Sequence, residues 1–206
     1  MENNLLYQFD LEKGKEIIGV DEAGRGPLAG SVVAAAVKLK RYSEELQEIN
    51  DSKKLTEKKR EKLFDIIMEN FEVGIGIVSV QEIDELNILN ATFLAMRRAI
   101  EELDKKTNTD VLVLVDGNFK IREYIGKQEP IIKGDAKSLS IAAASIIAKV
   151  TRDRQLVEEG KKYPEYHFEK HKGYGTKAHR EALLQYGVTP IHRKTFLTKI
   201  LGENAK

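Results

Sequence analysis

Three apolar segments of this chain each end in an aspartate, and no other feature of the sequence constrains the fold as strongly. Short, near-continuous apolar runs predict strands that are buried in a sheet. The three junctions are Val20-Asp21-Glu22, Val115-Asp116 and Lys133-Gly134-Asp135. Because sites in open α/β sheets gather at strand ends, separate strands can bring these acidic side chains together.

The first junction leads into a turn with unusual backbone freedom. Gly24 and Gly26 flank Arg25 in this turn, and glycine, which lacks a Cβ, lets the backbone approach a ligand closely. Side chains alternate across a strand, so Asp21 and Glu22 are expected on opposite faces. They would share a metal ion only if the strand twists or breaks there, and the glycines that follow favour such a break.

The ligand chemistry of the carboxylates indicates Mg²⁺ or Mn²⁺. Hard oxygen ligands select these cations over zinc, and the chain contains no cysteine. Two such cations about 3.5–4 Å apart would generate hydroxide and stabilise both oxygens of an in-line displacement at phosphorus. His167 and His171 have the spacing of a zinc-protease helix, but Glu169 does not fall where that motif needs it, so we interpret both as surface histidines.

Charge is distributed unevenly along the sequence. The whole chain has a formal net charge of +1, whereas residues 161–206 hold 10 lysines and arginines against 4 acidic residues, a net charge of +6 that leaves −5 for residues 1–160. An acidic body beside a basic segment suits a site that holds cations and binds a polyanion next to them. A solvated basic helix explains the gradient equally well, so charge alone does not decide for nucleic acid.

Other global features bear on the cellular setting. The first residues lack the basic and apolar regions of a secretory signal. No apolar run approaches the roughly 18 residues that a bilayer requires. The absence of cysteine fits a reducing compartment. We therefore expect a cytoplasmic protein with no membrane association.

Apolar periodicity predicts alternating strands and helices, with Thr56 as the cap of one helix and Ser79 and Glu82 in capping-box spacing at the start of another. We expect a lead-in helix or coil at 1–15, strands at 16–23, 31–39, 73–80, 110–115 and 130–133, and helices at 57–69, 79–104, 138–157, 177–186 and 195–201. The first two strands should pair antiparallel across their tight connection. Alanines in the helix over 138–157 would let it lie close to the sheet. We expect a catalytic domain, residues 1–160, and a basic helical extension, residues 161–206.

A series of short motifs spans about residues 17–195. The motifs are Gly19-Val20-Asp21-Glu22-Ala23-Gly24-Arg25-Gly26-Pro27-Leu28-Ala29-Gly30, Asp51-Ser52-Lys53-Lys54-Leu55, Asp116-Gly117, Lys133-Gly134-Asp135, Ser140-Ile141-Ala142-Ala143-Ala144-Ser145-Ile146-Ile147-Ala148-Lys149-Val150 with Arg152-Asp153, and His171-Lys172-Gly173-Tyr174-Gly175-Thr176. In this order and without a missing block, they resemble the motifs of bacterial ribonuclease HII, the type 2 ribonuclease H. The resemblance implies an α/β fold with a ribonuclease H-like mixed five-stranded sheet flanked by helices, and a small C-terminal helical extension.

The resemblance also implies an activity. Such an enzyme is an endonuclease that hydrolyses the RNA strand of RNA–DNA hybrids and cuts 5′ of single ribonucleotides embedded in duplex DNA, leaving a 3′-hydroxyl and a 5′-phosphate. The oligomeric state stays open, with a monomer as the default expectation. It implies two Mg²⁺ or Mn²⁺ ions. The catalytic and metal-binding residues would be Asp21, Glu22, Asp116 and Asp135. The backbone of Gly24, Arg25 and Gly26 would read the ribose 2′-hydroxyl, and Tyr174 would sense the junction between ribonucleotide and deoxyribonucleotide.

Other residues receive interpretations from their local sequence. Lys53 is a candidate for phosphate contact, as are Lys54, Lys172 and Lys177, although each is equally consistent with solvated surface. We interpret Asp51 as a turn former and Asp153 as the partner of a neighbouring basic residue, Lys149, Arg152 or Arg154. Tyr163 and Tyr166 are interpreted as packing residues.

Two alternatives remain open. One is another two-metal nuclease of the same superfamily that acts on DNA. The other is a non-catalytic protein that binds hybrids with the same fold. Comparing cleavage of an all-DNA duplex with cleavage of a hybrid tests the first alternative. Binding of a hybrid without turnover in Mg²⁺ would favour the second.

Overall fold

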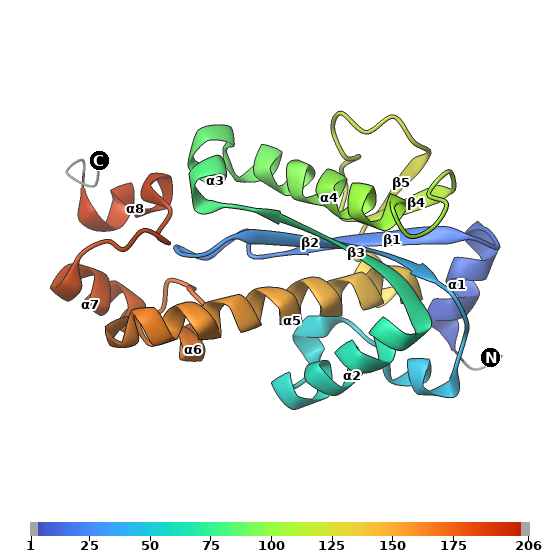
Figure 1. Ribbon diagram of the computed structural model, residues 1–206, viewed down its shortest axis with the longest axis horizontal. Helices are drawn as coiled ribbons and strands as arrows, with labels where there is room; N and C mark the ends of the chain where they lie inside the picture. Colours follow the sequence, from blue (N-terminus) through green and yellow to red (C-terminus); the bar gives the residue numbers. More distant parts are fainter. Residues whose placement is uncertain (1–3, 203–206) are drawn as a thin grey trace.

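The computed structural model describes residues 4–202 and is built on one mixed sheet (Figure 1). Strand β1 (Ile17–Ala23) pairs antiparallel with β2 (Val32–Leu39), which in turn pairs antiparallel with β3 (Phe71–Val78). On its other side β1 pairs parallel with β4 (Leu112–Asp116), and β4 pairs parallel with β5 (Gln128–Ile131). The order β3-β2-β1-β4-β5 confirms the predicted five-stranded mixed sheet.

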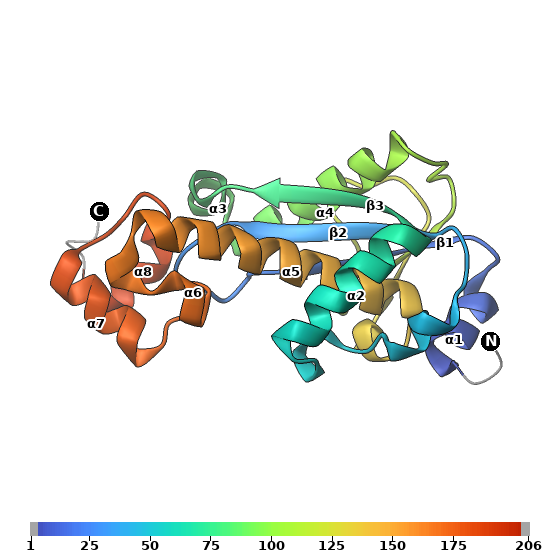
Figure 2. The ribbon, with the colours of Figure 1, turned by 60° about the horizontal axis from the view of Figure 1, so that its bottom comes forward.

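Helices cover both faces of this sheet. Helix α4 (Ile88–Asp104) lies on one face, and α5 (Leu139–Lys162) and α2 (Glu57–Asn70) lie on the other, as Figures 1 and 2 show from two directions. The short helix α1 (Leu5–Lys13) packs beside the start of α5. Two buried apolar clusters, one on each face, hold the layers together. A chain of this length can bury such a core in one domain.

The close approach of α5 to β1 follows from small residues on both elements. The alanines of the first two turns of α5 are fully buried, as the sequence predicts. On the sheet side, a Cβ at Gly19 would collide with the backbone of Ser140. Because α5 therefore rests directly on β1, the residues at the end of β1 lie beside the middle of that helix.

Capping residues fix where the helices begin, and one of them corrects a prediction. Thr56 caps α2, and Ser79 and Glu82 form a complete capping box at the start of α3 (Val80–Leu86), both as predicted. The single helix predicted over 79–104 is wrong, because the chain breaks at Asn87. This residue has a φ of 67° and its side chain accepts hydrogen bonds from the first amides of α4, so it ends one helix and caps the next.

The C-terminal part of the chain packs as a separate cluster at the far end of α5 (Figure 1). It comprises a short 3₁₀ turn (Pro164–Tyr166), α6 (Phe168–His171), α7 (Lys177–Tyr186) and α8 (Lys194–Leu201). Tyr166 is buried and Tyr163 packs against the same cluster, so both are packing residues as predicted. No sequence signal predicts α6.

Several helix and strand boundaries in the structure differ from the predicted ones. Helix α5 continues to Lys162, five residues beyond the predicted end, and so runs through residue 160, where we expected the catalytic domain to end. Three short 3₁₀ helices, Glu44–Glu48, Ser52–Lys54 and Gly134–Ala136, occupy segments for which no helix was predicted. Residues 1–3 of the predicted lead-in segment and 203–206 of the predicted extension lie outside the described residues. Within residues 4–202 no helix combines the length and the apolarity that a membrane crossing needs.

Candidate active site

The candidate site lies in a notch of the sheet where β4 stops. The pairing of β1 with β4 ends at Val20 and Val115, whereas β1 and β2 stay paired to Ala23. The last residues of β1 therefore extend beyond β4, with open space on that side. Both strands run parallel, so their carboxyl ends deliver Asp21 and Asp116 to the same place.

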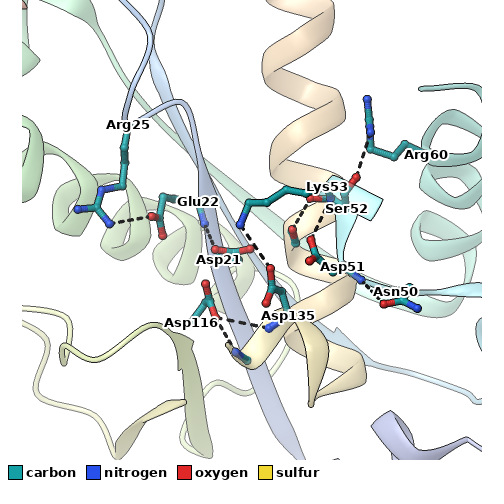
Figure 3. A network of polar contacts seen from close by, with 12 residues as sticks. Asp21, Glu22, Arg25, Asn50, Asp51, Ser52, Lys53, Arg60, Asp116 and Asp135 are labelled. Carbon is teal, nitrogen blue, oxygen red and sulfur yellow. Dashed lines mark hydrogen bonds and ion pairs between the residues drawn. The ribbon is translucent and has the colours of Figure 1, made fainter. Parts of the chain in front are cut away.

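Three of the four predicted carboxylates come together there (Figure 3). One oxygen from each of Asp21, Asp116 and Asp135 lies within 4.8 Å of the other two. Asp135 reaches the group from a 3₁₀ helix rather than from the strand end that the sequence predicted. After β5 the chain turns at Lys133, which has a φ of 57°, and this turn points the following helix back toward β4.

Glu22, the fourth predicted carboxylate, stands at the border of this acidic triad. It lines the same cleft as Asp21 and its carboxylate lies 3.3 Å from the guanidinium of Arg25. Figure 3 shows Glu22 turned toward Arg25, while Asp21 faces the other aspartates. As the alternation along β1 predicts, the side chains of Asp21 and Glu22 point in different directions. Both still line one cleft, because the end of β1 extends beyond its pairing with β4.

Hydrogen bonds fix the geometry of the triad. One carboxylate oxygen of Asp116 accepts from the amides of Gly134 (2.7 Å) and Asp135 (3.4 Å), which ties the 3₁₀ helix to β4. The amide of Glu22 donates to Asp21 at 2.7 Å. These local contacts hold the carboxylates in place although their charges repel.

The electrostatics of the site favour a bound cation. Burial, followed by the charges of Glu22 and Asp116, raises the pKa of Asp21 well above its ordinary value. Burial and the charge of Asp116 also raise the pKa of Asp135, partly opposed by Lys53. Because Asp21 and Asp135 are harder to ionise beside the neighbouring carboxylates, a divalent cation that binds all three aspartates would remove the repulsion.

Lys53 is the predicted lysine that reaches this site. Its ammonium lies 3.5 Å from Asp135, and its side chain is otherwise exposed. The side chain of Asp51 accepts from the amide of Lys53 at 2.9 Å and caps the short helix that carries it, so Asp51 forms a turn as predicted. Lys172 is buried, where it pairs with Glu57 and donates to a backbone carbonyl, which leaves it no free surface for a phosphate.

The triad adjoins a cleft of about 200 Å³ that gathers most of the other predicted residues. Gly24, Arg25, Gly26 and Tyr174 line it, together with Ser145 and Lys149 of α5. Sequence reasoning missed these last two as cleft residues, although their four-residue spacing places them on one face of a helix. Lys149 also pairs with Asp153 at 2.7 Å, which settles the predicted partner of that aspartate.

The histidines do not form a metal site with the triad. His167 is exposed, as predicted, but His171 is half-buried and stacks on His179 with a centroid distance of 4.6 Å. Burial lowers the pKa of His171. The prediction of a surface histidine is therefore wrong for His171, because α6 folds it against α7.

Comparison with known proteins shows the family to which this sequence is similar. A sequence model of the family described as Ribonuclease HII matches residues 18–199. Among curated proteins, ribonuclease HII of Fusobacterium nucleatum is 69% identical over 201 residues, which cover 97% of this chain and 93% of that protein. Ribonuclease HII of Clostridioides difficile is 53% identical over 96% of this chain and 76% of that protein.

Solved structures agree with the sequence comparison. The crystal structure of ribonuclease H2 from Pyrococcus horikoshii superimposes with a TM-score of 0.71 at 30% identity, over 92% of this chain and 98% of that one. Fold, strand-end carboxylates and sequence therefore lead to one conclusion. This chain belongs to the ribonuclease HII family and is a ribonuclease H, an endonuclease of the hydrolase class.

Proposed function

We propose that this enzyme hydrolyses the RNA strand of RNA–DNA hybrids and cuts 5′ of single ribonucleotides embedded in duplex DNA, leaving a 3′-hydroxyl and a 5′-phosphate. The observation that carries the proposal is the triad of Asp21, Asp116 and Asp135, of which Asp21 and Asp135 are buried; one oxygen of each converges within 4.8 Å beside a cleft lined by glycine backbone. Membership of the ribonuclease HII family supports the substrate class.

The donor set of the triad fits Mg²⁺ or Mn²⁺. Three carboxylates from separate elements offer hard oxygen ligands with no sulfur or imidazole among them. Asp21, Asp116 and Asp135 would hold one cation, and Glu22 at the border would help to hold a second. Cations bound there would supply the positive charge that stabilises negative charge developing at phosphorus and would lower the pKa of water.

The residues around the triad would bind and orient the nucleic acid. The backbone of Gly24, Arg25 and Gly26, which is exposed at Arg25 and Gly26, would contact the ribose 2′-hydroxyl, which distinguishes RNA from DNA. The ring of Tyr174, 43% exposed at the other side of the cleft, would stack on the sugar or base at the ribonucleotide–deoxyribonucleotide junction. Lys53 would contact a phosphate next to Asp135.

Two further features belong to the same proposal. Residues 161–206, with their net charge of +6, would form an extension of the catalytic domain 1–160 that contributes to binding of the polyanionic duplex. The protein would act as a monomer in the cytoplasm, a setting that the absence of cysteine fits.

A single set of substrates tests the proposal. The purified protein is incubated with an RNA–DNA hybrid, a DNA duplex containing one ribonucleotide, and the same duplex without it, each with Mg²⁺, with Mn²⁺ and with EDTA. We expect cleavage of the first two in either metal, a product end that a ligase can rejoin, and no cleavage in EDTA. Cleavage of the all-DNA duplex at a comparable rate would refute the proposal in favour of a DNA nuclease.

A further inference from the structure

Two arginines behind the cleft are completely buried, and their hydrogen bonds are unusual. Arg152 of α5 and Arg193, just before α8, are both 0% exposed. Within residues 4–202, every hydrogen bond that their side chains donate ends on a backbone carbonyl rather than on a carboxylate. Burying a guanidinium costs several kcal/mol unless such contacts offset the loss of hydration. These hydrogen bonds are therefore what allows both arginines to be buried.

Arg193 binds the turn that carries the two cleft glycines. Its guanidinium donates to the carbonyls of Gly24 (2.6 Å) and Arg25 (3.1 Å), and also to Gly30 (2.7 and 2.9 Å). Its own amide donates to the carbonyl of Leu28 at 2.9 Å. Burial and the nearby Arg152 lower the pKa of Arg193 to about 9, which still leaves it charged at neutral pH.

Arg152 fastens the adjoining backbone to the tyrosine loop. It donates to the carbonyls of Ala29 (2.9 Å) and Ser31 (3.0 Å) on the turn, and to Lys172 (2.9 Å), two residues before Tyr174. Its guanidinium carbon lies 5.9 Å from the centre of the Tyr174 ring. The two arginines therefore connect both segments that would read the substrate.

The carbonyl contacts of Arg193 determine where the amides of the turn point. All peptide bonds of the described chain are trans, so each C=O is opposed by the N–H of the next residue. Because the carbonyls of Gly24 and Arg25 point inward to Arg193, the amides of Arg25 and Gly26 point outward. Within the described residues neither amide donates a hydrogen bond to the protein, and both residues are exposed at the cleft.

We propose that Arg193 is a positioning residue for ribonucleotide specificity: it holds the Gly24–Gly26 turn from behind so that two unpaired amides face the ribose 2′-hydroxyl. This proposal rests on the proposed function. It assigns to the C-terminal segment a role in selecting the sugar, which its basic charge alone does not provide. Without Arg193, we expect the turn to remain, but the amides of Arg25 and Gly26 would no longer be held toward the ribose 2′-hydroxyl.

Arg193→Lys tests this role, because a compact ammonium cannot reach carbonyls that a planar guanidinium contacts together. Affinities for the one-ribonucleotide duplex and the all-DNA duplex are measured in Ca²⁺ under conditions where no cleavage is detected. We expect the ratio of the two affinities to fall by about tenfold, the effect of misplacing one or two hydrogen bonds, with all-DNA affinity changed by less than roughly twofold. A merely structural role would lower both affinities together and leave the ratio unchanged, which would overturn the proposal.

Arg97→Lys is the matched control. Arg97 also donates to a backbone carbonyl, that of Arg122 (2.7 Å), and pairs with Glu123, but it lies on α4 across the sheet from α5. Its variant should keep the wild-type ratio. The cleavage assay on wild-type protein separates the two proposals, because an inactive wild type refutes the function before any variant is made.

A measurement on the wild-type protein covers the case in which Arg193 variants do not fold. Amide hydrogen exchange of Arg25 and Gly26 should be fast in the free protein and should slow at least severalfold when the one-ribonucleotide duplex is added in Ca²⁺. The all-DNA duplex should give no such protection. Equal protection by both duplexes, or none by either, would contradict the assignment of these amides to the 2′-hydroxyl.

Discussion

Replacing Asp21 by asparagine should stabilise the metal-free fold while removing activity. Asparagine keeps the shape of the side chain but not its charge, and Asp21 is the most buried member of the acidic triad. Like charges about 4.8 Å apart repel by roughly 3 kcal/mol at an effective dielectric constant of about 20. The same repulsion contributes to the raised pKa of Asp21, and we expect its removal by the neutral amide to gain about 1–2 kcal/mol.

The pH dependence of this gain has a definite sign. The pKa of Asp21 is raised in the folded state from an ordinary value of 3.8. Ionisation therefore destabilises the fold increasingly as the pH rises from about 4 through the folded-state pKa. Below pH 4 the wild-type carboxyl is protonated in both states, so Asp21→Asn should have little advantage there. The advantage should be largest at alkaline pH.

Thermal unfolding in EDTA and in Mn²⁺ measures this effect. For a chain of this size, 1 kcal/mol corresponds to about 2–4 °C in Tm, so Asp21→Asn should melt about 2–8 °C higher than wild type in EDTA at pH 8. Saturating Mn²⁺, which stabilises by RT ln(1 + [L]/Kd), should raise the Tm of wild type more than that of the variant. Cleavage of the one-ribonucleotide duplex should be nearly abolished.

The buried Asp153 provides a control for the same chemical change. It pairs with Lys149 instead of facing other carboxylates, so Asp153→Asn should lower the Tm in EDTA. A lower Tm for Asp21→Asn as well would show that the triad is not under electrostatic strain. Normal cleavage by Asp21→Asn would refute its role at the site.

Four further substitutions test other parts of the reasoning. Gly24 has a φ of +98° and a Cβ there would collide with a buried arginine, whereas a Cβ at Gly26 would meet only the Tyr174 ring at 3.9 Å. Gly24→Ala should therefore lower the Tm by several degrees, while Gly26→Ala should keep the Tm and lose cleavage. A lower Tm for Gly26→Ala together with an unchanged Tm for Gly24→Ala would contradict the geometry of the turn. Tyr174→Ala should reduce cleavage at a lone ribonucleotide more than it reduces stabilisation by Mn²⁺, and equal losses on every substrate would exclude a junction sensor. Asp10 accepts hydrogen bonds from both side chain and amide of Ser140 (each 2.8 Å), so Asp10→Ala should cost about 1–3 kcal/mol, measured by urea unfolding; an unchanged midpoint would show that this buried contact contributes nothing.

Local rules were enough to predict much of the fold and three members of the triad. Apolar runs that end in Asp21 and Asp116 identify β1 and β4, because a few consecutive apolar residues are enough to indicate a buried strand. Thr56 caps a helix and Asp51 forms a turn, both as predicted, since each role needs only amides two or three residues ahead. Resemblance to a known family added proposed roles for residues that no local rule identifies, such as Tyr174.

Only the tertiary structure decided how the carboxylates are arranged. Glu22 is adjacent to Asp21 in sequence, yet it turns to Arg25 at the border of the triad, because β4 ends beside Val20 and leaves the end of β1 open. Asp135 reaches the group through a turn at Lys133 that its strand pattern did not indicate. Such positions depend on where neighbouring strands stop, which the sequence of one strand does not contain.

The sequence by itself determined which chemistry this protein carries: oxygen ligands at the ends of buried strands, glycines at the turn beside them, and an aromatic residue between glycines in a basic segment. The tertiary structure decided what holds that chemistry in position. Arg193 donates to the carbonyl of Gly24 from 169 residues away, and nothing in the sequence around either residue indicates the contact. A buried guanidinium is matched by carbonyls that the fold collects from distant segments, so its partners are known only once the chain is folded.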